Sequence, residues 1–191
     1  MASVMIIRHA ERGDEINAPK SQLSPKGIAD SQAFGKKITG SLIDQAGGSL
    51  EIRTYQTLLN ILLTAGLAPK ILGGDIRLGS EKQIFKDFGA AARGFSNIQK
   101  ECGSAIKALR IVLDPDKYAF LKFQLLDAIK EACMSDGNVL LCTHSPQMEL
   151  AIEIITGEQC NLDIKELDWF VVEMIDGDFK IVASNIKGLN L

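Results

Sequence analysis

Short apolar runs alternate along the chain with longer segments of helical periodicity. Runs of strand length, which are typical of buried strands, are found at 4–7, 70–72 and 138–142. Near the C-terminal end, the runs 169–175 and 179–184 are separated by Asp176-Gly177. Two such runs joined by a two-residue turn predict an antiparallel hairpin.

Helical periodicity is found at 26–38, 54–65, 118–134 and 147–155. Ser24-Pro25 is a good start for the first helix, because serine can cap a helix and proline suits its first position. Gly66 and Gly157 are placed to end the second and fourth helices. From residue 73 to 113 the signals are mixed, and we expect helices interrupted at Gly89, Gly94 and Gly103. The glycine doublets 47–48 and 73–74 are predicted to be turns.

Strands that alternate with helices predict an α/β fold. We expect a three-layer sandwich with a mostly parallel central sheet, helices on both faces and a C-terminal antiparallel hairpin. A chain of 191 residues is long enough to bury a core without disulfides or metal, so we expect a single domain over residues 1–191.

Composition and charge exclude several classes of protein. The net charge of -3 argues against a nucleic-acid binder, which usually has a basic face. No apolar run approaches the roughly 20 residues that a membrane span needs, and the first residues run into a strand without a signal peptide. The four cysteines form no CxxC pair, and with two histidines they fit no zinc-finger spacing. Free thiols in a reducing cytoplasm are the expectation.

Both histidines follow predicted strands, His9 after the run 4–7 and His144 after the run 138–142. In α/β sheets, the carboxyl ends of the strands form the ligand crevice. An arginine–histidine pair such as Arg8-His9 is by itself common in polar loops. Two further arginines change this interpretation. Arg12 follows His9 closely, and Arg53 lies at the start of a predicted helix. The pattern favours a site for an anion, which must be attracted by local arginines because the protein's overall charge is negative.

Four motifs occur in order along the chain: Arg8-His9-Ala10, Leu23-Ser24-Pro25-Lys26-Gly27, Arg53-Thr54-Tyr55-Gln56-Thr57 and Thr143-His144. They resemble the RHG motif, the leucine-threonine-glycine helix entry, the RTxQT helix start and the late strand-end histidine of the histidine phosphatase superfamily. The resemblance covers about the whole chain. Ala10 and Ser145 replace glycines that are usual in the family, and the SSPL stretch is altered to Ser49-Leu50-Glu51-Ile52. No side chain that would take part in the chemistry is lost.

The resemblance implies a role for each matched residue. His9 would be the nucleophile that is transiently phosphorylated, with a backbone carbonyl fixing its tautomer, and His144 would donate to the developing charge. Arg8 and Arg53 would bind phosphate oxygens with their guanidinium forks. Arg12 matches a third phosphate-binding arginine, although a solvated loop arginine is an equal alternative. Because the arginines neutralise the phosphate, no metal and no cofactor are expected.

A proton donor for the leaving group is also expected. In the mutase-like branch of the family a glutamate supplies it, and Glu81 in Arg77-Leu78-Gly79-Ser80-Glu81 is the best match. Asp75 is its rival, and a surface carboxylate is the alternative for either. The family usually builds its substrate lid in the stretch that follows, so we expect a helical lid or insert at about 81–122.

The leading functional hypothesis is hydrolysis of phosphomonoesters, with a small phosphorylated metabolite or a phosphoprotein as substrate. His144-Ser145-Pro146 is similar to the HxP form of bacterial phosphohistidine phosphatases, which makes such a phosphatase the second hypothesis. A non-catalytic member that binds a phosphorylated ligand is a third. Phosphoglycerate mutase activity is the least favoured, because the asparagine- and serine-rich continuation of mutases after RHG is missing.

Overall fold

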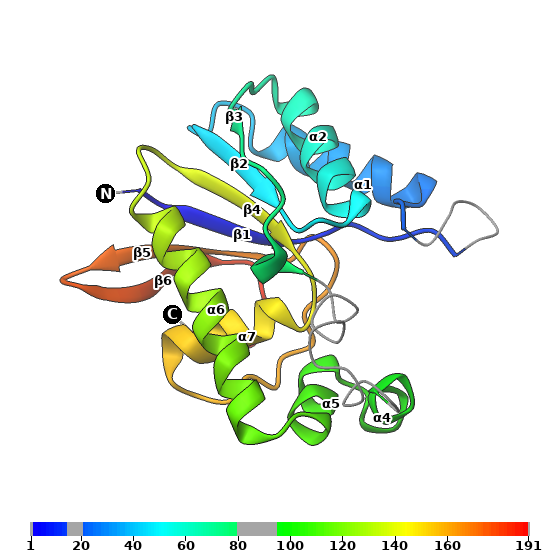
Figure 1. The fold of residues 1–191 in the computed structure, drawn as a ribbon. Helices are drawn as coiled ribbons and strands as arrows, with labels where there is room; N and C mark the ends of the chain where they lie inside the picture. The colour runs from blue at the N-terminus through cyan, green and yellow to red at the C-terminus, as the bar shows by residue number, and fades with distance from the viewer. Residues whose placement is uncertain (1, 15–20, 80–94, 191) are drawn as a thin grey trace.

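The computed structural model describes residues 2–14, 21–79 and 95–190. It contains one mixed six-stranded sheet in the order β3-β2-β4-β1-β5-β6 (Figure 1). The strands are β1 (Val4–Arg8), β2 (Gln45–Gly48), β3 (Lys70–Ile71), β4 (Val139–Thr143), β5 (Trp169–Ile175) and β6 (Asp178–Ser184). The helices are α1 (Pro25–Lys37), α2 (Ile52–Ala65), η1 (Ile76–Leu78), α4 (Phe95–Cys102), α5 (Ala105–Val112), α6 (Pro115–Cys133) and α7 (Gln147–Thr156).

Strands β3, β2, β4 and β1 are parallel, and β5 and β6 add the antiparallel hairpin. All five residues of β4 are buried, as expected of a central parallel strand covered on both faces. In the register of β1 with β4, Arg8 lies opposite Thr143. His9 and His144 therefore leave the sheet side by side.

Two helical layers cover the sheet. Helices α1 and α2 pack together on one face and bury Phe34, Leu58 and Ile61 against it. Helices α6 and α7 cover the other face, where Ile129 and Met148 belong to the larger hydrophobic core. This arrangement, visible in Figure 1, confirms the predicted three-layer α/β sandwich with a mostly parallel sheet and a terminal hairpin.

The residues predicted to cap helices and to form the hairpin turn have these roles in the structure. Ser24 Oγ accepts a hydrogen bond of 2.9 Å from the Gly27 N–H and so caps α1. Gly66, at φ +70°, ends α2 in the left-handed conformation that favours glycine. Asp176 and Gly177 both have positive φ, at 56° and 90°, as the two-residue hairpin turn of type I′ requires.

The prediction of a turn at Gly47-Gly48 is wrong, because both glycines lie in β2. A Cβ atom on Gly48 would lie 3.0 Å from the Cys142 carbonyl oxygen and 3.1 Å from Thr54 Oγ1. The chain needs glycine here because β2 runs close to its neighbours. A strand without large apolar side chains gives no hydrophobic signal in the sequence.

The described part of the expected lid, from residue 95 onward, is helical. Gly103, at φ +68°, separates α4 from α5 as predicted, and α6 continues beyond residue 122 to Cys133 without a break. Glu81, Gly89 and Gly94 lie outside the described residues. All four cysteines are free thiols.

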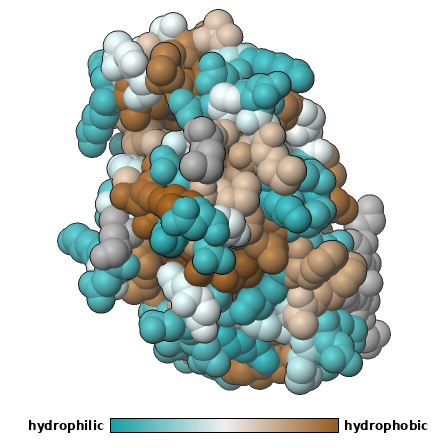
Figure 2. Space-filling model, turned by 90° about the vertical axis from the view of Figure 1, so that its left-hand side faces the viewer, coloured by the Kyte–Doolittle hydropathy of each residue, from teal (hydrophilic) through white to brown (hydrophobic). Residues whose placement is uncertain are grey.

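The four parallel strands begin at the edge of the sheet opposite to the one where β1 and β4 end, on the side of the N-terminus (Figure 1). Figure 2 shows that side, where hydrophobic side chains gather in the middle among hydrophilic ones. Within the described ranges, no helix is long and apolar enough to cross a membrane.

Candidate active site

The two histidines meet at the carboxyl edge of the sheet. The His9 N–H donates to the Thr143 carbonyl oxygen at 2.9 Å, which fixes the end of β1 beside the end of β4. The ring centroids of His9 and His144 are 4.9 Å apart, and the ring planes are inclined by 63°. Both side chains are buried, with exposed fractions of 6% and 1%. Two residues that are far apart in the sequence therefore form one polar centre.

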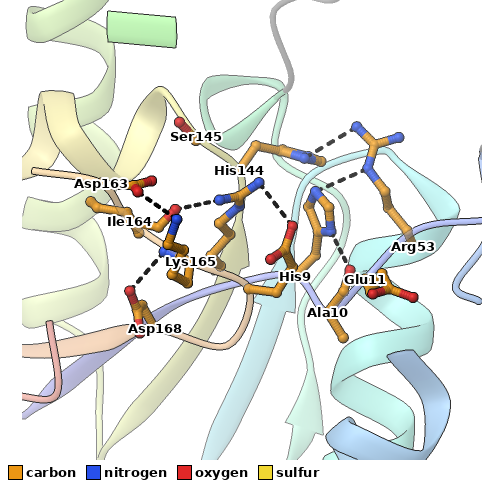
Figure 3. A network of polar contacts seen from close by, with 12 residues as sticks. His9, Ala10, Glu11, Arg53, His144, Ser145, Asp163, Ile164, Lys165 and Asp168 are labelled. Atoms are coloured by element: carbon orange, nitrogen blue, oxygen red, sulfur yellow. Dashed lines mark hydrogen bonds and ion pairs between the residues drawn. The ribbon is translucent and has the colours of Figure 1, made fainter. Parts of the chain in front are cut away.

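Arg53 joins the two rings. It lies in the first turn of α2, and its Nε donates to His9 Nε2 at 3.3 Å. Its Nη2 lies 3.2 Å from His144 Nδ1, and its Nη1 donates to the Glu51 carboxylate at 3.0 Å. Figure 3 shows the guanidinium group reaching both histidines from the side of α2.

These contacts define the tautomers of both rings. His9 Nδ1 lies 2.7 Å from the Ala10 carbonyl oxygen, which can only accept, so Nδ1 carries the proton. The Nε2 atom of His9 then carries no proton, and its electron pair, which a nucleophile requires, accepts the hydrogen bond from Arg53. Because Arg53 can only donate, His144 accepts at Nδ1, and its Nε2 donates to Ser49 Oγ at 2.7 Å.

Both imidazoles are held neutral. Burial is the main reason that the pKa of His9 falls from 6.5 to about 3. The positive charges of Arg53, Arg8 and Arg12 lower it further, while the hydrogen bond to Ala10 acts in the opposite direction. Burial also lowers the pKa of His144 well below 6.5, with further contributions from His9, Arg53 and Arg8.

The low pKa of His9 predicts a specific loss of stability in acid. Between pH 6.5 and about 3, unfolded His9 binds a proton that folded His9 does not bind. The free energy of unfolding therefore falls as the pH falls, by about 1.4 kcal/mol per pH unit for one histidine. Denaturant unfolding should be measured at pH 7.5 and at pH 5. The free energy of unfolding should fall less between these two pH values in His9→Asn than in the wild type, by about 2 kcal/mol. Equal losses would contradict the buried neutral state of His9.

Arg8 and Arg12 complete a cluster of positive charge. Arg8 donates through Nη1 to the Ile164 carbonyl oxygen and through Nη2 to Glu166 at 3.2 Å. Its Nε is buried and has no hydrogen-bond partner in the described part of the chain, so one donor is available to a ligand. The Arg12 residue is exposed and lines the same cavity as Arg8.

A cavity of about 460 Å³ opens above the histidines. It is lined by Arg8, His9, Arg12, Arg53 and His144. Residues of α4 and α5 and of the segment after α7 also line it, among them Gln99, Lys107, Asn161, Asp163 and Glu166. The size suits a small molecule. The three arginines in the lining can neutralise a phosphate dianion in a protein whose net charge is negative.

Of the two expected carboxylic acids, only Asp75 lies in the described part of the chain. Both Asp75 carboxylate oxygens accept hydrogen bonds of 3.0 Å from Arg77 Nε, and Asp75 lines a separate cavity of about 210 Å³. The structure therefore does not bring Asp75 to His9. The prediction for Glu81 concerns a residue outside the described ranges. Among the described residues, no group of three or more histidines, cysteines or carboxylates could hold a metal ion.

Solved structures share this fold over nearly the whole chain. YhfR from Bacillus stearothermophilus has a TM-score of 0.68 at 15% identity, covering 100% of this chain and 98% of its own. Alpha-ribazole phosphatase from Shigella flexneri has a TM-score of 0.64 at 14% identity, with 99% and 98% covered. A protein from Agrobacterium tumefaciens assigned as the phosphohistidine phosphatase SixA has a TM-score of 0.60 at 16% identity, with 98% and 99% covered. The chain has the histidine phosphatase fold. No family model matches the sequence, and no curated protein does.

In this histidine phosphatase fold, several polar residues that the sequence did not single out support the site. Ser49 binds His144, and Glu51 binds Arg53, as described above. Thr57 Oγ1 accepts a hydrogen bond of 3.1 Å from the Ala10 N–H, and Gln56 Oε1 accepts one of 2.8 Å from the Leu23 N–H. The RTxQT motif was the feature of the sequence that could have indicated the roles of Gln56 and Thr57. Its polar side chains bind the backbone of the loop after His9 and of the segment before α1.

Proposed function

We propose that this protein is a phosphatase that hydrolyses phosphomonoesters through a phosphohistidine formed on His9. The observation that carries the proposal is the state of His9. Its Nδ1 is bound to a backbone carbonyl, and its unprotonated Nε2 faces Arg53 and His144 beside a polar cavity. A neutral imidazole oriented in this way is suited to attack phosphorus.

The surrounding cations are suited to bind and stabilise the phosphoryl group. Phosphoryl transfer depends mainly on positioning and on neutralising charge that spreads over three oxygens. Arg8, Arg53 and Arg12 are proposed to bind these oxygens, and binding requires that Arg53 exchange its contacts with the histidines for contacts with phosphate. His144 is proposed to become protonated beside the bound dianion and to donate to it. The arginines supply the neutralisation in this scheme, so we propose a reaction without metal or cofactor.

The fold similarity supports a phosphatase, because the alpha-ribazole phosphatase and the protein assigned as SixA carry such names. The substrate proposed for this chain is a small phosphorylated metabolite, since the cavity is of small-molecule size. The free state of all four thiols supports a reducing compartment such as the cytoplasm.

The direct test is incubation with 4-nitrophenyl phosphate, with and without a chelator. We expect steady release of 4-nitrophenol that the chelator leaves unchanged. Loss of turnover with chelator would contradict the metal-free scheme. Binding of vanadate or phosphate with no turnover would identify a non-catalytic protein that binds phosphorylated ligands.

A second candidate is a protein phosphohistidine phosphatase. It is favoured by His144-Ser145-Pro146, by the similarity to the protein assigned as SixA, and by the position of Asp75 away from His9. Imidazole is a good leaving group, so such a substrate needs little help from an acid. Rapid dephosphorylation of a phosphohistidine peptide, with slow turnover of every phosphorylated metabolite in a panel, would favour this candidate.

A further inference from the structure

Glu149 is a buried carboxylic acid at the cavity. It lies in the first turn of α7, has an exposed fraction of 3%, and lines the same cavity as His9 and His144. Its Oε1 accepts a hydrogen bond from Ser145 Oγ. Its Oε2 is buried and has no hydrogen-bond partner among the residues that the structure describes. Leaving an ionised oxygen in this state is costly, so the protonated form is favoured.

The groups around Glu149 do not remove this cost. Burial is the main cause that raises the pKa of Glu149, and the negative charge of Asp163 adds to it. The hydrogen bond from Ser145, the backbone N–H of Glu149 itself and the positive charge of Arg8 act in the opposite direction, and Cys160 is a nearby neutral thiol. The net effect of these groups is a raised pKa of Glu149. Glu149 therefore keeps its proton to a higher pH than an exposed glutamate.

Glu153, one turn later on α7, is equally buried, but both of its carboxylate oxygens have hydrogen-bond partners. Its exposed fraction is also 3%, but it accepts hydrogen bonds from Arg110, from Tyr118 at 2.7 Å and from the Cys160 N–H at 3.0 Å. It does not line the cavity with the histidines. Glu153 therefore has a structural role, and it can serve as a control for Glu149 because it is an equally buried glutamate on the same helix.

Ser145 connects Glu149 to the cavity. Its side chain lies on the side of His144 that faces away from Arg53 (Figure 3), and it lines the cavity. Besides the histidines, the cavity is lined by Ser145, Glu149 and residues of the segment 161–166. A leaving group that departs from the phosphate into this part of the cavity would meet the Ser145 hydroxyl group.

We propose that Ser145 and Glu149 together form the proton donor for the leaving group, an inference that rests on the proposed function. When Glu149 is protonated on Oε1, its hydrogen bond with Ser145 is reversed: Oε1 donates to Oγ, and the Ser145 proton can be donated to the leaving oxygen. As His9 Nε2 bonds to phosphorus and the ester P–O bond breaks, Ser145 Oγ gives its own proton to the leaving oxygen and takes the Oε1 proton of Glu149. Glu149 is then a carboxylate. In the second step, water bonds to phosphorus and the P–N bond breaks, while the proton released by the water returns through Ser145 to Glu149. Such a donor serves poor leaving groups, so the substrate class is phosphate monoesters of alcohols.

The test compares an alkyl phosphate with 2,4-dinitrophenyl phosphate, whose leaving group needs no proton. In Glu149→Gln and in Ser145→Ala, kcat/KM for the alkyl ester should fall by roughly 10²-fold or more. The value for the dinitrophenyl ester should stay within about threefold, since stabilisation of the phosphoryl group is unchanged. The wild-type rate on the alkyl ester should fall as the pH rises through the pKa of Glu149, and this limb should vanish in Glu149→Gln. Glu153→Gln, assayed below its unfolding temperature, should behave like the wild type on both esters.

Equal losses on both esters in either variant, or no loss on the alkyl ester, would overturn the inference. A selective loss in Glu81→Gln with normal rates in Glu149→Gln would also overturn it and would assign the acid to Glu81. These outcomes differ from failure of the proposed function, in which the wild type would not hydrolyse even 2,4-dinitrophenyl phosphate. Ser145→Ala keeps the test decisive if Glu149→Gln does not fold.

Discussion

Replacement of Arg53 by alanine should lower kcat/KM for 4-nitrophenyl phosphate by roughly 10²- to 10³-fold or more, the loss that follows removal of one preorganised donor to the developing charge. The expectation comes from the position of Arg53, which contacts both His9 and His144. Removal of its side chain takes away a phosphate ligand and the group that links the two rings. Steady-state kinetics with the purified variant measure the effect.

Arg53→Lys and Arg77→Ala are suitable comparisons. Lysine keeps the positive charge but lacks the planar guanidinium group, so Arg53→Lys should show most of the loss in kcat/KM that Arg53→Ala shows. Arg77 is bound to Asp75, Asp127 and Glu131 away from the histidines, so Arg77→Ala should keep the wild-type rate below its unfolding temperature. If Arg53→Ala had a near-normal rate, the assignment of the helix-start arginine would be wrong.

Replacement of His9 by alanine should abolish turnover, with a loss of roughly 10⁴-fold or more, as is found when a nucleophile is removed. No other described side chain at the cavity combines a fixed tautomer with an unprotonated ring nitrogen facing Arg53. His144→Ala should lose less activity, because His144 is proposed to act as a donor and not as the attacking group. Turnover is measured with 4-nitrophenyl phosphate at enzyme concentrations high enough to detect slow release.

Binding of vanadate by His9→Ala serves as the control for folding. The three arginines remain in this variant, so vanadate should still bind and raise the unfolding temperature. Turnover by His9→Ala at more than a few per cent of the wild-type rate would show that another group attacks phosphorus.

Much of the fold could be predicted because its elements carry strong local signals. Ser24-Pro25 marks the start of α1, Gly66 marks the end of α2, and Asp176-Gly177 forms the hairpin turn. The apolar pattern does not predict β2, because Gly48 is required by its close contact with Cys142 and Thr54 and gives no hydrophobic signal. Such tertiary contacts are not visible in a local window of sequence.

The pairing of the histidines could be predicted for a topological reason. Two residues that follow parallel, adjacent strands must lie at the same edge of the sheet, and β1 and β4 are such strands. The contacts of Ser49 and Glu51 could not be predicted in the same way, because β2 itself was missed. The periodicity over residues 147–155 places Glu149 in a helix, but its burial at the cavity depends on how α7 packs against the sheet.

Direct detection of the covalent intermediate is the most decisive measurement. The wild type would be mixed with a radiolabelled phosphomonoester, quenched in base within milliseconds and digested for mass spectrometry. We expect a base-stable, acid-labile phosphoryl group on the peptide that contains His9, formed and lost at rates compatible with turnover and absent in His9→Ala. Turnover without any label on the protein, or label on another residue, would contradict nucleophilic attack by His9.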